Sequence, residues 1–283
     1  MDEKSIENRI TEKLREQLGP LPFGVCSYAL IKDRLIDCRA KARIPAGALR
    51  VISVAFPYYL GKAYYEHSNI SMYAVPADYH RIAGDIIRGA AEALREAVPG
   101  YRFEPFIDNS PVPEVFAASC AGLGVIGKNG LLIHEKYGSF CFLGEIITDF
   151  PLTPGRDAPA PCIDCGECAR QCPSGVLRGE CFEKDKCLSD ISQKKSDLDE
   201  DEKEMLVDSG CAWGCDVCQK VCPMNENAAV SPIREFYETA RPVFRAGDSV
   251  EGRAFAWRGD KVINRNVELL EKKSESERPK TND

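Results

Sequence analysis

Two closely spaced runs of cysteines constrain this chain more than any other feature. The first run has the spacing C-x-x-C-x-x-C-x-x-x-C-P, and the second has C-x-x-C-x-x-x-C-P. Cysteine thiolates bind 4Fe–4S clusters with this spacing, so two runs predict two clusters, which carry single electrons. The chain is therefore predicted to be a redox protein. The cysteines of the first run are Cys162, Cys165, Cys168 and Cys172, and those of the second are Cys215, Cys218 and Cys222.

The spacing also predicts how the two runs share their ligands. The first three cysteines of a run reach one cluster, whereas the last cysteine ligates the other cluster. The predicted ligands are Cys162, Cys165, Cys168 and Cys222 for the first cluster and Cys172, Cys215 and Cys218 for the second, which needs one more.

Three other cysteines compete for that place, and the spacing does not choose among Cys181, Cys187 and Cys211. Cys211 precedes Cys215 by four residues rather than three, so the second run is not a full C-x-x-C-x-x-C. Zinc is the alternative interpretation, because paired C-x-x-C motifs also suit a tetrahedral thiolate site. Zinc does not account for the C-x-x-x-C-P ending that occurs twice, so clusters are the preferred prediction.

The rest of the sequence agrees with a cytoplasmic redox protein. The chain begins M-D-E-K-S-I-E-N-R, without the apolar segment of a secretory signal. No apolar run approaches the ~20 residues of a membrane span. The fourteen cysteines are therefore expected to be ligands and free thiols rather than disulfides. Four of them are expected to be small buried hydrophobic residues; they are Cys26, Cys38, Cys120 and Cys141.

The charge balance bears on partners. The net charge is −7, whereas proteins that bind nucleic acids tightly and non-specifically usually carry a basic domain or stripe. Residues 195–204 are interpreted as a solvated acidic stretch. No DNA and no membrane partner is expected.

The length of 283 residues fits about two domains, and a stretch rich in proline separates them. Helical periodicity predicts helices over residues 4–18 and 79–98. Apolar runs rich in β-branched and aromatic residues predict strands at Phe23–Ile31, Leu49–Phe56, Tyr101–Ile107, Leu131–His134 and Phe140–Thr148. The predicted organisation is a mixed α and β domain (1–150), a linker (151–161), the double-cluster domain (162–232), a C-terminal helical extension (233–271) and a disordered tail (272–283).

Two segments of the first domain, Ser71–His80 and Asp108–Gly130, carry polar residues and glycines that a plain core would not need. The glycines of G-L-G-V-I-G-K-N-G permit close approach of the backbone to a ligand. Asn129 stands where a P-loop would need Ser or Thr. The pattern G-x-G-x-x-G is also discounted as a dinucleotide fingerprint, because a helical stretch over residues 111–123 precedes it where a strand is needed. Helix capping is the alternative role for Asp78 and Asp108, and packing is the alternative for His80.

Up to about residue 270, the chain resembles the epoxyqueuosine reductase family. Y-A-V-P-A-D-Y-H matches that family's Y-A-x-G-x-D-Y-H, and I-D-N-S-P-V-P-E matches its strand-end aspartate segment. The long signature A-G-L-G-V-I-G-K-N-G-L-L-I, followed by Y-G-S-F-C-F-L-G-E-I-I-T-D-F-P-L, matches nearly residue for residue. D-K-C-L-S and W-G-C-D-V-C-Q-K-V-C-P-M-N match the segments around the second cysteine run.

This resemblance implies a fold, cofactors and a reaction. The implied fold class is α+β: a nitroreductase-like α/β sandwich that binds cobalamin, then a ferredoxin-like domain with two 4Fe–4S clusters. Cobalamin would be held base-off, electrons would pass through the clusters to cobalt, and epoxyqueuosine in tRNA would be reduced to queuosine. Asp108 would be the proton donor, and Cys187 would complete the second cluster. The residues that line the corrin or the substrate would be Tyr73, Asp78, Tyr79, His80, Gly127, Lys128 and Asn129.

The chain also departs from the family pattern. Longer members continue into HEAT-like repeats that help to hold the tRNA, and this sequence, which ends shortly after Phe255–Asn266, is interpreted as a short form. Pro76 replaces a glycine of the tyrosine-rich motif, and Asn109 and Ser110 differ from the small residues usual there. Two alternatives stay open: a non-tRNA substrate, as in the related reductive dehalogenases, or an electron-transfer protein without a corrinoid. The candidate partners are tRNA and an electron donor such as ferredoxin or flavodoxin.

Overall fold

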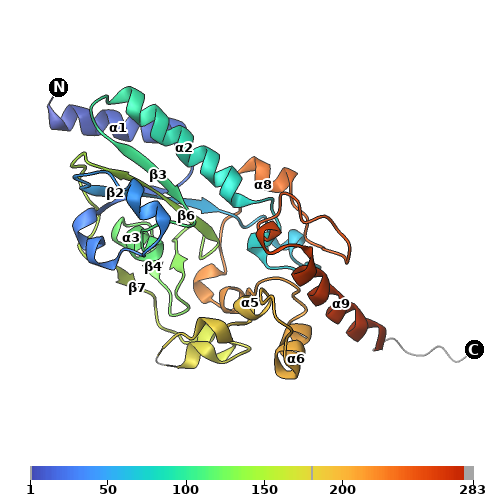
Figure 1. Ribbon diagram of the computed structural model, residues 1–283. Helices are drawn as coiled ribbons and strands as arrows, with labels where there is room; N and C mark the ends of the chain where they lie inside the picture. The colour runs from blue at the N-terminus through green and yellow to red at the C-terminus, as the bar shows by residue number, and fades with distance from the viewer. Residues whose placement is uncertain (1, 180, 277–283) are drawn as a thin grey trace, which may run out of the picture. The chain divides into compact units, whose positions relative to one another are not determined.

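The computed structural model describes residues 2–179 and 181–276, and its chain forms two compact units (Figure 1). Each unit is assembled from segments that lie far apart in the sequence. The first unit contains the chain up to Tyr59, then Tyr79–Asp164 and Met224–Arg234. The second unit contains Leu60–Asp78, Cys165–Pro223 and the chain from Glu235 onward.

A four-stranded antiparallel sheet, in the order β1-β2-β6-β3, forms the centre of the first unit. The central strands β2 and β6 pair from Arg50, opposite Thr148, to Pro57, opposite Cys141. Both are buried along most of their length, and a strand covered on both faces has a continuous apolar sequence rather than an alternating one. The four strands are β1 (Phe23–Ser27), β2 (Arg50–Pro57), β3 (Phe103–Ile107) and β6 (Cys141–Thr148).

Helices cover both faces of this sheet (Figure 1). α1 (Glu3–Leu18) packs on α2 (Tyr79–Ala97), and α2 packs on β3 and β6. α3 (Glu114–Cys120) packs against β1, β2 and β6. Successive side chains of a strand point to opposite faces of the sheet. Gly144 of β6 therefore faces Ile87 of α2, whereas Leu143 and Ile147 face the core beneath α3.

A small sheet in the order β5-β4-β7 completes the first unit, with β4 (Val125–Ile126), β5 (Leu132–Ile133) and β7 (Ala160–Pro161). Its last strand comes from the proline-rich stretch that the sequence predicts to be a linker. This stretch is packed: the amide of Gly155 donates to the carbonyl of Val25 at 2.7 Å. The linker prediction is therefore wrong, because backbone pairing binds the prolines to the first unit.

The second unit is built mainly from short helices. α4 packs beside α7, and α6 packs on α5 and α9. A capping box between Asp199 and Glu202 fixes the start of α6. No described helix has both the length and the apolar content that crossing a membrane would need. The helices are α4 (Glu167–Arg170), α5 (Leu188–Ile191), α6 (Glu200–Ser209), α7 (Val217–Lys220), α8 (Arg234–Glu238, which begins in the first unit) and α9 (Asp260–Ser276). Short 3₁₀ turns occur at Tyr28–Leu30, Lys32–Arg34, Arg39–Arg43, Lys62–Tyr64, Met72–Ala74, Val176–Arg178, Lys184–Lys186, Pro223–Asn225 and Ala256–Arg258.

Two segments belong to a different unit from the one that the sequence predicts. Residues 60–78 lie in the second unit, where the buried carboxylate of Asp216 accepts a 2.5 Å hydrogen bond from the Ser71 hydroxyl. Residues 224–234 return to the first unit, where the Ser231 hydroxyl donates to the last carbonyl of β2 at 2.5 Å. Hydrogen bonds between residues so distant in the sequence leave no mark on local composition.

The C-terminal helix is longer than predicted. α9 runs to Ser276 and buries Val262, Ile263 and Val267. The prediction of a disordered tail is therefore wrong for residues 272–276, and residues 277–283 lie outside the described residues.

Candidate functional site

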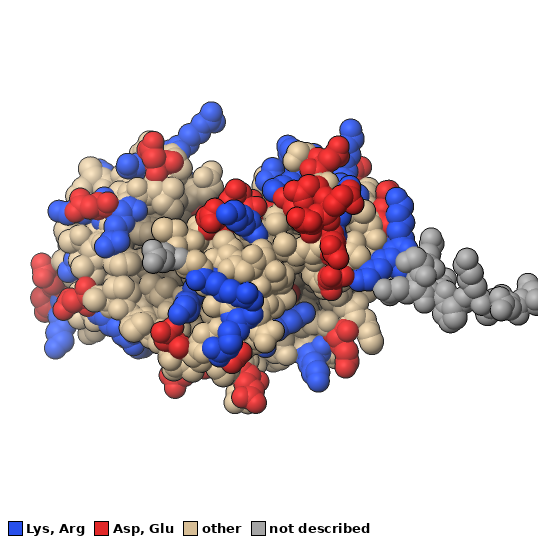
Figure 2. Space-filling model, turned by 90° about the horizontal axis from the view of Figure 1, so that it is seen from below, with Lys and Arg blue, Asp and Glu red and all other residues tan. Residues whose placement is uncertain are grey.

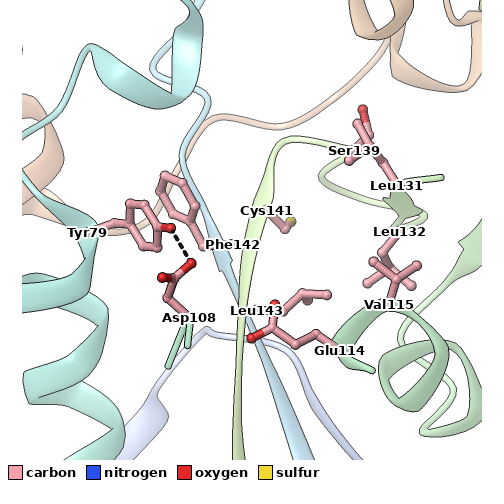
Figure 3. Close-up of a pocket in the computed structure, with 10 residues that line it drawn as sticks. All are labelled: Tyr79, Asp108, Glu114, Val115, Leu131, Leu132, Ser139, Cys141, Phe142 and Leu143. Atoms are coloured by element: carbon pink, nitrogen blue, oxygen red, sulfur yellow. Dashed lines mark hydrogen bonds between the residues drawn. The ribbon is translucent and has the colours of Figure 1, made fainter. Parts of the chain in front are cut away.

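A cavity of about 190 Å³ lies in the first unit, where β3 ends and β6 begins (Figure 3). Its wall combines a cluster of aliphatic side chains with two carboxyl groups, a thiol and an aromatic ring pair. Such a mixture of an apolar wall and a few polar groups is typical of small-molecule sites. The lining residues are Tyr79, Asp108, Glu114, Val115, Leu131, Leu132, Ser139, Cys141, Phe142 and Leu143.

Asp108 follows β3 directly and is held in an unusual backbone conformation, with φ at +49°. Its carboxylate accepts a 3.0 Å hydrogen bond from the Tyr79 hydroxyl and lies 3.1 Å from Nε2 of His80 (Figure 3 shows the first of these). The ring of Tyr79 stacks on His80 and on Phe142, with centroids 4.1 and 3.8 Å apart. The first turn of α2 and the start of β6 therefore place the carboxylate at the cavity.

These hydrogen bonds lower the pKa of Asp108. The hydrogen bond from His80 lowers the pKa of Asp108 to about 2, against the opposing effect of burial and with help from the amide of Asn109 and the hydroxyl of Tyr79. At neutral pH an ordinary aspartate is already an anion, and these contacts strengthen that preference. The sequence predicts Asp108 as a proton donor, and as an anion it must first receive a proton.

The structure also brings two glutamates together that the sequence analysis missed. Glu114, the first residue of α3, points into the cavity (Figure 3), and burial with the charges of Glu145 and Asp108 raises its pKa well above the usual range. Glu145 is 0% exposed in the middle of β6. Burial raises the pKa of Glu145 to about 8, against the hydrogen bond that it accepts from Ser110 at 3.1 Å. A glutamate inside the apolar run F-C-F-L-G-E-I-I-T was the signal that could have found it.

The glycine-rich loop predicted to line the corrin or substrate is the turn between β4 and β5. The amide of Gly127 donates to the carbonyl of Leu131 at 2.8 Å, and a Cβ on Gly127 would lie 2.3 Å from Oδ1 of Asn129. Lys128 forms a 3.0 Å ion pair with Asp164, within the first cysteine run. The cavity is lined by Leu131 and Leu132, which follow this turn, and not by Gly127. The missing side chain at Gly127 therefore makes room for Asn129 within the turn.

The tyrosine-rich motif is divided between the two units. Tyr79 and His80 belong to the first unit and contact Asp108, as described above. Tyr73 and Asp78 belong to the second unit, where the indole of Trp213 donates to the Tyr73 hydroxyl at 2.7 Å. The sequence predicts all four as one group, whereas in the structure Tyr79 lines the cavity and His80 contacts the carboxylate of Asp108.

Several of the predicted cluster ligands gather in the second unit. Cys168 lies on α4 and Cys218 on the adjacent α7. Burial is the main cause that raises the pKa of Cys215 to about 11, and the nearby thiols of Cys187 and Cys172 contribute to it. These three cysteines are thus electrostatic neighbours. Among residues 2–179 and 181–276, no three His, Cys, Asp or Glu side chains form a group that could hold a single metal ion.

Cys172 has the most distinctive surroundings of these thiols. Burial would raise its pKa, but hydrogen bonds from the amides of Leu177, Gly175 and Ser174 and from the Ser174 hydroxyl lower the pKa overall. The hydroxyl lies 3.6 Å from the sulfur. Donors arranged around a sulfur stabilise the thiolate, which is the form that ligates metal clusters.

The three candidates for the eighth ligand differ in their surroundings. Cys211 donates its thiol to the carbonyl of Trp213 at 3.2 Å, and burial raises its pKa strongly. Cys181 is exposed. Cys187 is half-buried at the start of α5 and close enough to Cys215 to affect its pKa. Cys211 also interacts electrostatically with Cys215, so what distinguishes the two candidates is that the Cys211 thiol is engaged with a backbone carbonyl.

The four cysteines expected to be buried hydrophobic residues divide evenly. Cys26 and Cys120 are 0% exposed, as predicted. Cys38 and Cys141 are only partly buried, and Cys141 lines the cavity. Burial of its thiol strongly raises the pKa of Cys141, so the group is neutral.

Two family profiles match the chain. The profile described as "4Fe-4S double cluster binding domain" matches residues 161–225, and the one described as "Epoxyqueuosine reductase QueG, DUF1730" matches residues 39–109. The epoxyqueuosine reductase of Listeria monocytogenes is 35% identical over 206 residues, which cover 68% of this chain and 54% of that protein. That of Cyclobacterium marinum is 35% identical over 222 residues, which cover 75% and 69%. The chain thus spans about half the length of the Listeria relative.

Solved structures share the fold. The epoxyqueuosine reductase of Streptococcus thermophilus has a TM-score of 0.77 at 24% identity, over 94% of this chain and 80% of that one. An epoxyqueuosine reductase solved with an epoxyqueuosine-modified tRNA-Tyr stem loop has a TM-score of 0.78 at 22% identity, over 95% and 81%. Together with the double-cluster profile, these likenesses confirm the predicted α+β fold class.

Proposed function

The chain belongs to the epoxyqueuosine reductase family, and we propose that it reduces epoxyqueuosine in tRNA to queuosine. The reaction replaces an epoxide by a carbon–carbon double bond and releases the oxygen as water. It consumes two electrons and two protons. The observation that carries the proposal is the cavity with its two carboxyl groups, in a chain that also carries a double-cluster domain.

The electrons would enter through two 4Fe–4S clusters. Eight cysteine thiols are the right donor set for two such clusters, and three of the four predicted for the second cluster are electrostatic neighbours. An electron donor such as ferredoxin or flavodoxin would supply the electrons one at a time. The proposed ligands are those that the sequence predicts, with Cys187 as the eighth.

A corrinoid is the second cofactor that we propose. The cavity is far smaller than a corrin ring and would take only the reacting part of the ligand, beside the ring of Tyr79, which is stacked between His80 and Phe142. Tyr79 and His80 are the residues of the first unit that would hold it. When bound, the corrinoid would supply the redox centre that reacts with the substrate.

Asp108 would deliver one of the two protons. Its carboxylate lies at the cavity and accepts hydrogen bonds from two groups that can pass it a proton, His80 and Tyr79. A general acid of this kind contributes roughly 100- to 10,000-fold to a rate. Tyr79 and His80 would therefore both orient the carboxylate of Asp108 and return a proton to it.

The proposed substrate carrier is tRNA. Figure 2 shows lysines and arginines interspersed with acidic side chains on the face that it draws, rather than gathered in one stripe. With a net charge of −7, the chain has no excess of positive charge to bind phosphates without selectivity. Recognition would therefore depend on the shape of the anticodon loop more than on overall charge.

The test is turnover by protein that has been reconstituted anaerobically with iron, sulfide and cobalamin. An anticodon stem-loop that contains epoxyqueuosine is the substrate, a chemical reductant supplies the electrons, and the product nucleoside is identified by mass spectrometry. We expect queuosine with cobalamin and none without it. Fully loaded protein that binds the stem-loop but forms no queuosine would refute the proposed reaction.

A further inference from the structure

We infer that Glu114 is a second proton donor of the cavity, and that Glu145 beneath it is the positioning residue that shares its proton. The inference rests on the proposed function, because epoxide reduction to an alkene consumes two protons. Asp108 is one carboxyl group and can deliver only one proton before it is reloaded. A second acid inside the same cavity removes the need to reload Asp108 in mid-reaction.

The geometry of the two glutamates fits a shared proton. Glu114 begins α3 and points into the cavity (Figure 3), and Glu145 faces α3 from the middle of β6. Oε1 of each residue is buried and has no hydrogen-bond partner among the described residues. The other oxygen of Glu145 accepts from Ser110. A buried carboxylate oxygen without a partner is strongly unfavourable when charged, so a protonated pair is the stable arrangement.

The surrounding charges favour the protonated form. The charged groups that face Glu114 are Glu145 on β6, Asp108 after β3 and His80 on α2. The two carboxylates disfavour a further negative charge, and burial acts in the same direction, whereas His80 opposes them. The N-terminus of α3 also favours the charged form. Burial and the two like charges prevail, and two adjacent carboxyl groups that share one proton are a known solution for acid catalysis.

The proton transfer can be written with its atoms and electrons in balance. The O–H bond of Glu114 breaks, its electron pair stays on the carboxylate, and the proton goes to the oxygen that leaves the substrate. Asp108 supplies the other proton, so that this oxygen departs as water. The two electrons come from the external reductant through the clusters. Solvent then returns a proton to the pair before the next turnover.

One readout needs neither substrate nor corrinoid. At neutral pH the unsubstituted protein should show the infrared stretching band of protonated carboxylic acids, and Glu114→Gln should weaken or shift it. Glu145→Gln should change or lose the same band. Glu92→Gln is the matched control, because Glu92 is an exposed residue of α2, and it should leave the band unchanged. A band unaffected by Glu114→Gln, in protein with normal cluster absorbance, would overturn the inference.

Turnover provides the second readout. Glu114→Gln should lower turnover by roughly 100-fold or more, and turnover of the unsubstituted protein should fall at alkaline pH, as Glu114 loses the proton that burial and the neighbouring carboxylates hold on it. Because a change at Glu145 in the sheet could impair folding, Glu114→Gln at the cavity wall carries the test. Full activity in Glu114→Gln overturns this inference alone. No turnover by the loaded, unsubstituted protein overturns the proposed function and the proton delivery with it.

Discussion

Nε2 of His80 lies 3.1 Å from the carboxylate of Asp108, and this contact is the main cause of the low pKa of that carboxyl group. The two residues come from different elements, the first turn of α2 and the end of β3. Their contact means that the family's strand-end aspartate is a hydrogen-bonded anion in the free protein. Its role in proton transfer is therefore joined to that of its histidine neighbour.

Asp108→Asn should reduce turnover roughly 100- to 10,000-fold, because the amide has no transferable proton. Asparagine tolerates a positive φ at least as well as aspartate, so the backbone at +49° should be kept. Cluster absorbance and cobalamin binding, measured on the same sample, should remain unchanged. Full activity of this variant would remove Asp108 from the mechanism.

His80→Gln should raise the pKa of Asp108 from about 2 toward its ordinary value of 3.8, since the largest cause of the shift is removed. Because the folded-state pKa lies below the ordinary value, the interaction stabilises the fold above about pH 4 and is lost as the pH falls through about 2. Carbon-13 NMR of the aspartate carboxyls measures the pKa directly, with Asp108→Asn to identify the signal. An unshifted signal in His80→Gln would contradict the contact.

Iron and acid-labile sulfide analysis of anaerobically purified protein should give about eight irons and eight sulfides per chain, the content of two 4Fe–4S clusters. The family profile over residues 161–225 supports this content. Zinc in stoichiometric amounts, without the visible absorption of iron–sulfur clusters, would favour the zinc interpretation instead.

Cys187→Ala should lose one cluster, whereas Cys211→Ala and Cys181→Ala should keep both. Cys187 is close enough to Cys215 to affect its pKa, while the thiol of Cys211 is engaged with the carbonyl of Trp213. Iron content and electron paramagnetic resonance of the reduced protein distinguish the variants. Loss of a cluster in Cys211→Ala but not in Cys187→Ala would reverse the assignment.

Gly24→Ala should destabilise the first unit by about 1–3 kcal/mol, the usual range for overpacking. A Cβ at this position would lie 2.2 Å from the backbone oxygen of Ala121, and neither side can move without shifting β1 or the end of α3. The control is Gly89→Ala, which meets nothing within 4 Å on α2 and should stabilise by up to about 1 kcal/mol. Thermal unfolding under anaerobic conditions compares the two. Equal midpoints would show that the close approach is relaxed in solution.

Local pattern was enough to predict most elements of the first unit. The apolar residues that recur every four positions over residues 4–18 became α1, and the apolar runs at Leu49–Phe56 and Phe140–Thr148 became the central strands β2 and β6. Phe23–Ile31 proved shorter, because the chain leaves the sheet after Ser27. Secondary structure follows from side-chain periodicity, which is a property of neighbours in the sequence.

The candidate site likewise contains residues that the sequence predicts and residues that only the fold brings together. Cysteine spacing predicts the cluster ligands, because a run of thiols must converge on a cluster whatever the rest of the chain does. The segments that carry Asp108, Tyr79 and His80 were also recognisable from their motifs. The glutamate pair was not recognisable from the sequence. Nothing in it indicates that the fold brings Glu114 of α3 near Glu145 of β6, or that one oxygen of each has no hydrogen-bond donor among the described residues.

The sequence by itself therefore determined most elements of the first unit, the presence of a double-cluster domain and the family. Only the tertiary structure decided that residues 60–78 leave the first unit, that the proline-rich stretch is packed, and which carboxyl groups are charged. The physical reason is that burial and long-range hydrogen bonds set both the unit to which a segment belongs and the pKa of a side chain. Both depend on residues far away in the chain, which periodicity and spacing do not report.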